Sequence, residues 1–422
     1  MAGMTAIEKI LAEHSGRARV QPGDAVEVDV DTIVVLDINF MTTIFPAEEI
    51  LKIDAPEKIV VIFDHFVPAN TIFAAEAQAR GRAFVHKFGI SRFHDIGQAQ
   101  GISHQVVADE AYIRPGELLV CADSHTCSGG AFNAAAHGLG SIDMLQATCL
   151  GKSWFICGPT VRYRLDGETP ASVTPKDVFL QIANEYGMHG GQNMEFCGSA
   201  LSNWTPNERR ALSTMCAEVG VEFPVFPFDD VLAAHYKERN IGGLRPVEPD
   251  RDAQYAADRV IDVSAVEPMV ALPGSVVHNC RKVTDLTEDR IAVQQCFVGS
   301  CSNGTLEDIR VAADIVRGRR VSPGVRFIVT PSSEAIHRQA VKAGYVSTLQ
   351  EAGAVVTSSA CGACGGVDMG VLGQGELAIA SSTRNYKGRM GSPDAGIFLA
   401  SSATVAATAV NGYISDPRGA LS

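Results

Sequence analysis

Two short stretches in the last third of the chain decide how its fold and chemistry are interpreted: Gly299-Ser300-Cys301-Ser302-Asn303-Gly304 and Ala360-Cys361-Gly362-Ala363-Cys364-Gly365-Gly366. The first contains a single cysteine, the second contains a C-x-x-C pair, and all three cysteines are set among small residues. This pattern indicates three thiolates that two loops bring to one metal centre. Because only three protein groups would bind the metal, one coordination position stays open for a substrate.

Other interpretations of these cysteines stay open on the residues alone. A C-x-x-C pair is also typical of thioredoxin-like redox proteins, which place it before a helix and make no use of a distant third cysteine. A structural zinc site would need a fourth ligand, and no nearby histidine or cysteine offers itself. Unrelated packing is the remaining alternative. The other eight of the eleven cysteines stand mostly among apolar residues and are expected to be buried small hydrophobes: Cys121, Cys127, Cys149, Cys157, Cys197, Cys216, Cys280 and Cys296.

Length and composition are those of an ordinary soluble globular protein with two or three domains. The 422 residues are too many for one compact core, and 46% hydrophobic and 20% charged residues are usual values. The net charge of −13 argues against a nucleic-acid or membrane-surface role. The start, Met1–Lys9, has no signal-peptide pattern, and no apolar run is long enough to cross a bilayer. Scattered cysteines in odd number argue against a disulfide framework. We therefore expect a cytoplasmic protein.

From about residue 290 onward, apolar strands alternate with helices. This alternation predicts a parallel sheet that is covered by helices on both faces. In such sheets ligands bind beyond the carboxyl ends of the strands, and Cys301, the cysteine pair and Arg384 all follow predicted strands. The expected strands are 291–298, 325–330, 354–357 and 377–381, and helices are expected to begin near 305 and 331.

The first segment follows the same strand-loop-helix pattern. A capping box at Thr5 predicts an opening helix. The apolar runs 58–63 and 117–122 predict buried strands, and each delivers a carboxylate and a histidine at its end, in Asp64-His65 and Asp123-Ser124-His125.

The remaining segments complete a three-domain organisation. An Ala-rich stretch after Gly129-Gly130 is expected to be helical. In the middle of the chain, helices are expected over 172–184 and 206–219, the second of which carries Glu218, and the acidic segment 246–252 reads as a surface connection. We therefore expect an α/β fold with three domains: 1–166, 167–285 and 286–422.

Histidine–carboxylate neighbours and clustered arginines suggest chemistry near the cysteines. A carboxylate beside a histidine can fix the tautomer of the ring and raise its basicity, which suits proton transfer. Asp64-His65 and Asp123-Ser124-His125 have this arrangement, and His104 adds a third histidine, although such residues also serve as plain helix caps. The stretch 384–389 places three cations in six residues. It is either a solvated turn, or its arginines, Arg384 and Arg389, grip carboxylates by forked hydrogen bonds.

Taken together, these motifs resemble the aconitase superfamily, and within it the branch of 3-isopropylmalate dehydratase and homoaconitase large subunits. No single motif is specific, but the combination is. The resemblance implies an aconitase-like α/β assembly of three domains, with parallel and mixed sheets flanked by helices around a central iron–sulfur cluster and no swivel domain. The matching motifs are Thr5–Leu11, Asp64-His65, Gly101–Gln105, Pro115-Gly116-Glu117, Asp123–Thr126, Glu218, Gly299–Asn303, Cys361–Cys364, Gly373 to Glu376, Arg384–Arg389 and Asp416-Pro417-Arg418.

The resemblance also implies a cofactor and a reaction. Cys301, Cys361 and Cys364 would hold one [4Fe–4S] cluster per chain, with one iron that lacks a protein ligand and acts as a Lewis acid on the substrate. The implied enzyme is a hydro-lyase of the 3-isopropylmalate dehydratase type, which removes and re-adds water on a hydroxy-di- or tricarboxylate, as in leucine biosynthesis. Positions implied to handle water are Asp64, His65, His104, Asp123, His125 and Glu218; those implied to bind substrate carboxylates are Ser124, Arg384 and Arg389.

The resemblance further implies a partner. In this superfamily a swivelling domain carries the serine that removes the carbon-bound proton, and this sequence ends at Ser422 before the place for it. We therefore expect a small-subunit partner, an anionic small-molecule substrate, and little turnover by this chain alone.

Two departures from the family pattern bear on the substrate. They are the loop Asp37–Thr42 and Thr383, where relatives usually have asparagine. They leave room for a sibling dehydratase that acts on homocitrate or a methylated malate, and for an inactive relative. A cluster-free regulatory or RNA-binding relative is a further alternative, which the acidic net charge disfavours.

Overall fold

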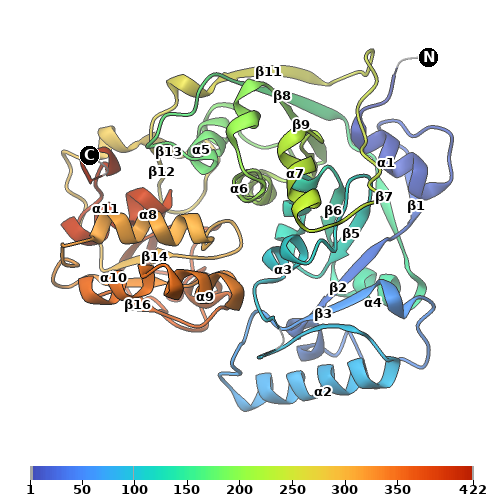
Figure 1. The fold of residues 1–422 in the computed structure, drawn as a ribbon, viewed down its shortest axis with the longest axis horizontal. Helices are drawn as coiled ribbons and strands as arrows, with labels where there is room; N and C mark the ends of the chain where they lie inside the picture. The colour runs from blue at the N-terminus through green and yellow to red at the C-terminus, as the bar shows by residue number, and fades with distance from the viewer. Residues whose placement is uncertain (1–2, 98, 421–422) are drawn as a thin grey trace.

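In the computed structural model, which describes residues 3–97 and 99–420, the strands form four sheets (Figure 1). The first sheet has five parallel strands in the order β4-β3-β2-β5-β6. These strands are β2 (Thr32–Leu36), β3 (Ile59–Ile62), β4 (Arg92–His94), β5 (Leu118–Cys121) and β6 (Ala135–Gly138). An antiparallel pair, β1 (Ala25–Asp29) and β7 (Lys152–Ile156), lies beside it.

The two other sheets come from the middle and the end of the chain. The middle sheet is parallel, in the order β10-β9-β8-β11, and consists of β8 (Thr160–Asp166), β9 (Gln192–Cys197), β10 (Val221–Val225) and β11 (Ala257–Asp262). The third sheet is mixed, in the order β13-β12-β18-β17-β14-β15-β16, and consists of β12 (Met269–Ala271), β13 (Cys280–Lys282), β14 (Gln295–Val298), β15 (Arg326–Val329), β16 (Val355–Val356), β17 (Leu377–Ala380) and β18 (Gly396–Ala400).

Eleven α-helices of the described residues flank these sheets. Helices α8, α10 and α11 cover the third sheet, and α2 runs along the first sheet at the bottom of Figure 1. None of these helices combines the length and the apolarity that crossing a bilayer requires. Their bounds are α1 (Ala6–Ser15), α2 (Ile72–Phe88), α3 (Ser103–Asp109), α4 (Ser141–Leu150), α5 (Pro175–Tyr186), α6 (Pro206–Met215), α7 (Asp230–Glu238), α8 (Leu306–Val316), α9 (Glu334–Lys342), α10 (Tyr345–Ala352) and α11 (Ser402–Asn411).

Alternating strand residues divide the core into layers. In the first sheet, Val34 and Val60 face a central apolar cluster that is shared by all three large sheets, while Val35 and Val61 face a second cluster with α1 and α2. Because successive side chains of a strand point to opposite faces, such strands are buried on both sides and read as continuous apolar runs. The shared central cluster packs the sheets into one body.

The predicted α/β class with parallel and mixed sheets flanked by helices is confirmed. The Thr5 capping box is present and starts α1, as predicted. The expected helix after Gly129-Gly130 was wrong, because Ala135 and Ala136 belong to strand β6. The proposed division at residues 166/167 and 285/286 stays a prediction. Strand β8 lies wholly before the first boundary although it belongs to the middle sheet, and β12 and β13 lie before the second boundary although they belong to the third sheet.

Candidate active site

The lone cysteine lies in a tight loop directly after strand β14. Ser300 adopts a left-handed backbone conformation with a φ of 85° just before Cys301, which is strained for a residue with a side chain. Gly304 follows at a φ of 101°, where a Cβ would lie 2.8 Å from the carbonyl oxygen of Thr330. Cys301 is 9% exposed. The loop therefore holds this thiol at the carboxyl end of the third sheet, as the sequence pattern predicts.

The cysteine pair lies at the turn η8 (Gly362–Gly365), which follows strand β16: Cys361 precedes the turn and Cys364 is within it. The backbone N–H of Cys361 donates to the carbonyl oxygen of Asp64 at 2.9 Å, so this loop is joined to the end of strand β3. A hydrogen bond with Cys361 holds the pKa of Cys364 well below its usual value, and the Arg389 cation, whose Nη2 lies 3.5 Å from the Cys364 sulfur, adds to the effect. Cys364 therefore favours the thiolate, which is the form that binds metals.

The three sulfur atoms do not form the compact set of ligands that a single ion needs. Around one zinc ion, with Zn–S bonds of about 2.3 Å, thiolates lie about 3.8 Å apart. In the described part of the chain the sulfurs of Cys301, Cys361 and Cys364 do not all lie within 4.8 Å of one another. Buried hydroxyls without a partner among the described residues surround these loops and offer donors to sulfide or other acceptor atoms: Ser300, Ser359, Ser382 and Thr383. The residues present thus fit the iron–sulfur cluster that the resemblance implies.

His65 is surrounded by carboxylates at the end of strand β3. Its Nδ1 lies 2.6 Å from Asp64 Oδ1 and 3.6 Å from Asp37 Oδ1, and its Nε2 lies 3.6 Å from Asp123 Oδ2. Burial alone would lower the pKa of His65, but the carboxylates outweigh burial and raise the pKa well above its usual value. Asp37, the first residue of the loop that departs from the family pattern, also fixes the loop of His65 by accepting the backbone N–H groups of His65 and Phe66.

Asp123 joins two further histidines. Its Oδ1 lies 3.1 Å from His104 Nε2 and accepts the backbone N–H of His125 at 2.7 Å. Burial would raise the pKa of Asp123, but the hydrogen bonds from the histidines lower it well below its usual value. The His125 ring continues the network through Nε2, which lies 2.9 Å from Glu218 Oε1. Burial would lower the pKa of His125, but the Cys301 charge and these hydrogen bonds raise it well above its usual value.

Arg384 closes the network on the side of the third sheet. Its Nε donates to Glu218 Oε1 at 2.9 Å and its Nη2 donates to Ser124 Oγ at 2.6 Å. One oxygen of Glu218 therefore contacts both a histidine and an arginine. Arg389 lies beside Cys364, and its buried Nε has no partner in the described ranges. Two guanidinium groups in one region are well suited to bind carboxylates.

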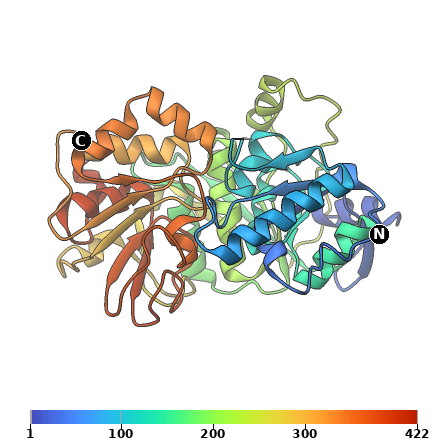
Figure 2. The same ribbon diagram turned by 90° about the horizontal axis from the view of Figure 1, so that it is seen from below.

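The contacts above join all twelve residues predicted for the site into one region. The first and third segments of the chain meet there, and Figure 2 shows how these two segments adjoin. Here the backbone N–H of Ile102 donates to the carbonyl oxygen of Ser332 at 2.8 Å, and Gly101 forms a bridge with Ser333. A Cβ on Gly101 would lie 2.6 Å from the Ser333 Cβ, so only glycine allows this approach. The individual roles of the twelve residues stay predictions.

The two departures from the family pattern also lie in this region. The loop after strand β2 folds into the turn η1 (Asp37–Met41), in which Asn39 Oδ1 accepts the backbone N–H of Leu36 at 2.8 Å. Thr383 is fully buried beside Arg384. The structure does not explain how either difference affects the choice of substrate.

Sequence reasoning missed two cations that contact the cysteine loop from the middle segment. Lys176, near the start of α5, donates to Ser302 Oγ and to the carbonyl oxygens of Ser381 and Ser382. Burial lowers the pKa of Lys176 to about 8, so the ammonium stays charged at neutral pH. Arg210, in α6, donates to the carbonyl oxygen of Cys301 at 2.5 Å. Neither stands in a motif with the cysteines, and only their place on the buried face of an amphipathic helix hinted at burial.

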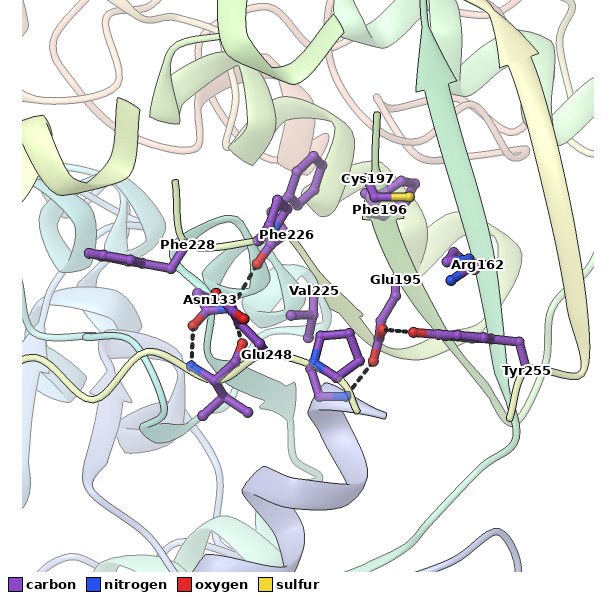
Figure 3. A pocket seen from close by; sticks show the side chains of 14 residues that line it. Asn133, Arg162, Glu195, Phe196, Cys197, Val225, Phe226, Phe228, Glu248 and Tyr255 are labelled. Atoms are coloured by element: carbon purple, nitrogen blue, oxygen red, sulfur yellow. Dashed lines mark hydrogen bonds between the residues drawn. The ribbon is translucent and has the colours of Figure 1, made fainter. Parts of the chain in front are cut away.

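A separate cavity of about 280 Å³ lies between α1, strand β9 and the segment around Tyr255 (Figure 3). Its lining is mostly apolar, with Phe196 and Phe226 among its walls. Glu195 points into it but accepts the backbone N–H of Ala6 at 2.6 Å and the Tyr255 hydroxyl at 2.7 Å. Since both of its carboxylate oxygens are used within the protein, Glu195 is not free to bind a ligand in this cavity.

Comparison with known proteins agrees with this geometry. The family model described as "Aconitase family (aconitate hydratase)" matches residues 47–412. The chain belongs to the aconitase family. It is 48% identical over 416 residues to a Mycolicibacterium smegmatis protein named 3-isopropylmalate dehydratase large subunit, covering 99% of this chain and 97% of the relative. The family resemblance inferred from the motifs is therefore confirmed.

Other relatives cover the same length. The chain is 41% identical to a Methanopyrus kandleri protein named 3-isopropylmalate dehydratase large subunit 1, covering 99% of each chain. It is 38% identical to a Methanothermobacter thermautotrophicus protein named probable methanogen homoaconitase large subunit, covering 99% of this chain and 98% of the relative. The crystal structure of Thermococcus kodakaraensis aconitase X has a similar fold, with a TM-score of 0.50, 11% identity, and coverage of 90% of this chain and 88% of that one.

Proposed function

We propose that this chain is the large subunit of an iron–sulfur hydro-lyase that removes and re-adds water on a hydroxydicarboxylate such as 3-isopropylmalate. One observation carries the proposal: three cysteines lie in one region with two arginines and a histidine–carboxylate network. The names of the similar large subunits support the same reaction class. Because one relative is named a homoaconitase, homocitrate should also be tested as a substrate, and by the same chemistry so should a methylated malate.

The cluster would be held by Cys301, Cys361 and Cys364, and when bound it supplies a Lewis-acidic iron that makes a hydroxyl a better leaving group. Around it, the cationic side chains of Arg384 and Arg389 bind the substrate carboxylates. Two carboxylate-binding cations suit a di- or tricarboxylate better than a neutral substrate.

The histidine–carboxylate network handles the water. His65 and His125 are held as cations by the carboxylates that contact them, so each can donate a hydrogen bond or a proton to the oxygen that leaves the substrate. Asp123, held as a carboxylate between three histidines, orients these rings. Glu218 fixes His125 and Arg384 through one oxygen, which keeps the proton donor and the carboxylate anchor at a constant separation. Asp64 and His104 complete the network, and Ser124 accepts from the anchoring Arg384 and adds a hydroxyl to the carboxylate site.

A second subunit completes the enzyme in this proposal. The relatives are named large subunits, which implies a small-subunit partner for each of them. We infer the same partner here, one that carries the swivel domain and the serine that removes the carbon-bound proton. We expect the heteromer to work in the cytoplasm and to bind neither nucleic acid nor membranes.

The test is anaerobic co-expression with the cognate small subunit, followed by assays on a panel of hydroxydicarboxylates. We expect brown protein that contains iron and sulfide and forms an unsaturated acid from at least one panel member. The variant Cys361→Ser should lose most of the iron and the activity, because one of the three thiolates that hold the cluster is removed. The control Cys149→Ser, a change at a half-buried cysteine outside the site, should keep both the iron and the activity. Colourless anaerobic wild-type protein without iron or sulfide would refute the proposal.

A loaded wild-type heteromer that converts no panel member would favour the inactive relative. Salt-sensitive RNA binding by the apo-protein would favour the cluster-free regulatory alternative.

A further inference from the structure

Two fully buried cations lie behind the loop of the lone cysteine. Lys176 and Arg210 are 1% and 0% exposed. Both come from helices of the middle segment, and both donate hydrogen bonds into the cysteine loop: Lys176 Nζ to Ser302 Oγ at 3.3 Å, and Arg210 Nη1 to the carbonyl oxygen of Cys301 at 2.5 Å. The middle segment thus contacts the metal-binding loop through two positive charges.

Neither cation has a carboxylate partner. Within residues 3–97 and 99–420 no ion pair of 4.0 Å or less involves Lys176 or Arg210. Their hydrogen bonds go to neutral oxygens, which besides the two above include the carbonyl of Ser382 at 2.8 Å and Gln105 Oε1 at 2.6 Å. A buried ion without a counter-charge costs several kcal/mol. Such a pair is therefore expected to persist because a nearby anion compensates it.

The cysteine thiolates are candidates for that anion, because Cys301 lies in the loop that both cations contact. Cys301 acts electrostatically on both cations. Two carboxylates also act on these cations through space, Asp308 on both and Asp109 on Arg210. Their oxygens already accept hydrogen bonds within the protein, Asp308 from Asn303 and Thr305 and Asp109 from Gln105. A cluster held by three thiolates keeps a net negative charge, which is what two buried cations would compensate.

We infer that Lys176 and Arg210 are positioning residues that supply the counter-charge for the metal–thiolate centre and hold the Cys301 loop against the middle segment. This inference rests on the proposed function for the presence of the centre. Lys176 also holds the carbonyls of Ser381 and Ser382, which immediately precede Thr383 and Arg384. It therefore ties the metal-binding loop to the loop of the substrate-binding arginine.

The chain offers a matched control on the same helix. Arg209 is as buried as Arg210, but it forms a forked ion pair with Asp229 and contacts the carbonyl of Leu201 instead of the cysteine loop. The variants Arg210→Met and Lys176→Met remove the unpaired charges, and Arg209→Met removes a paired one. Arg210→Lys and Lys176→Arg keep the charge but change the geometry.

The experiment measures each variant in the heteromer, without substrate, before and after anaerobic cluster reconstitution. Readouts are iron release to a chelator, the cluster reduction potential, and the rise in thermal midpoint on reconstitution. For Arg210→Met and Lys176→Met we expect iron release on the order of 10-fold to 100-fold faster, a more negative potential because a positive charge beside the cluster is lost, and a smaller rise in midpoint. Arg209→Met should lower both midpoints equally and leave the potential unchanged.

The variants that keep the charge separate the effect of losing the charge from a general loss of folding. Arg210→Lys and Lys176→Arg should keep a potential close to that of the wild type, and a shift as large as in the methionine variants would overturn the counter-charge role. Equal iron release and equal potentials in the Arg210→Met and Arg209→Met proteins would also overturn it. If the wild-type heteromer takes up no iron, the proposed function itself fails, so the two failures are told apart.

Discussion

Glu218 offers the sharpest test of the network, because one of its oxygens serves two partners. Its Oε1 accepts from His125 Nε2 and from Arg384 Nε, each at 2.9 Å, and its side chain is only 13% exposed. The change Glu218→Gln keeps the size of the side chain and one carbonyl oxygen, but it removes the negative charge. The expected loss is therefore the difference between charged and neutral hydrogen bonds.

The magnitude follows from the two contacts. A hydrogen bond to a charged group contributes about 1.5–3 kcal/mol and a neutral one about 0.5–1.5 kcal/mol. Losing about 1 kcal/mol at each contact gives about 2 kcal/mol, or about a 30-fold fall in kcat/KM. If the amide nitrogen instead of the oxygen faces the two donors, the fall is larger.

The assay is kcat/KM of the reconstituted heteromer on its best substrate, normalised to iron content. The control is Glu222→Gln, the same change at a carboxylate 3.6 Å from His137 and outside the network, for which we expect less than about a twofold effect. A Glu218→Gln enzyme with unchanged kcat/KM would refute the role of this network. A loss explained entirely by lower iron content would show that Glu218 acts only on the stability of the centre.

Two further predictions concern the fold. Burial alone would lower the pKa of His14, but the Asp31 carboxylate at 2.6 Å raises it. The pair therefore stabilises the chain fully below about pH 6.5, and this stabilisation is lost as the pH rises through the raised pKa of His14. Because the pKa of Asp31 is lowered, the stabilisation is also lost well below pH 4. The difference in thermal midpoint between wild type and His14→Gln should thus be largest near pH 5 to 6, and a constant difference up to pH 9 would contradict this. Gly130→Ala should lower the free energy of unfolding by about 3 kcal/mol in chemical denaturation, because the added Cβ would lie 1.7 Å from the carbonyl oxygen of Pro224. The control Gly190→Ala, which has open space around the added Cβ, should change the free energy of unfolding by less than about 1 kcal/mol.

Most of the fold could be predicted because its strands are buried on both faces and its helices carry explicit caps. The runs at 58–63 and 117–122 became strands β3 and β5, and the Thr5 box became the cap of α1. The helix expected over 206–219 ends earlier, at Met215, and Glu218 lies in the following turn η5 (Cys216–Val219).

The misassigned strand β6 shows where local patterns fail. Alanine has the highest helix propensity, yet Ala135 and Ala136 pair with Leu118 and Leu119 in the first sheet. Here the small side chains are required by packing, because the turn η3 (Ser124–Phe132) lies against β6 and a Cβ on Gly129 would lie 2.6 Å from that of Ala136. Such tertiary crowding does not appear in the local sequence pattern.

The site shows the same division between what adjacent residues reveal and what they do not. Asp64-His65 and the C-x-x-C pair could be found because each motif is continuous in sequence. Lys176 and Arg210 could not be found in this way, since they lie more than 90 positions before Cys301 (301 − 210 = 91). They contact the cysteine loop only because α5 and α6 pack against it.

That packing explains why the site can hold so many charged groups. Each charged group of the network contacts an opposite charge, whereas the two cations behind the cysteine loop form no ion pair within the described residues, and a metal–thiolate centre would supply a further negative charge beside them. Metal binding and tertiary packing are then coupled, because the group that fills the site also offsets the cost of burying the cations. The cysteine loop is held by the middle segment, the cysteine pair by the end of strand β3, and the arginine by Glu218, so all three segments must be folded together before the centre can be complete.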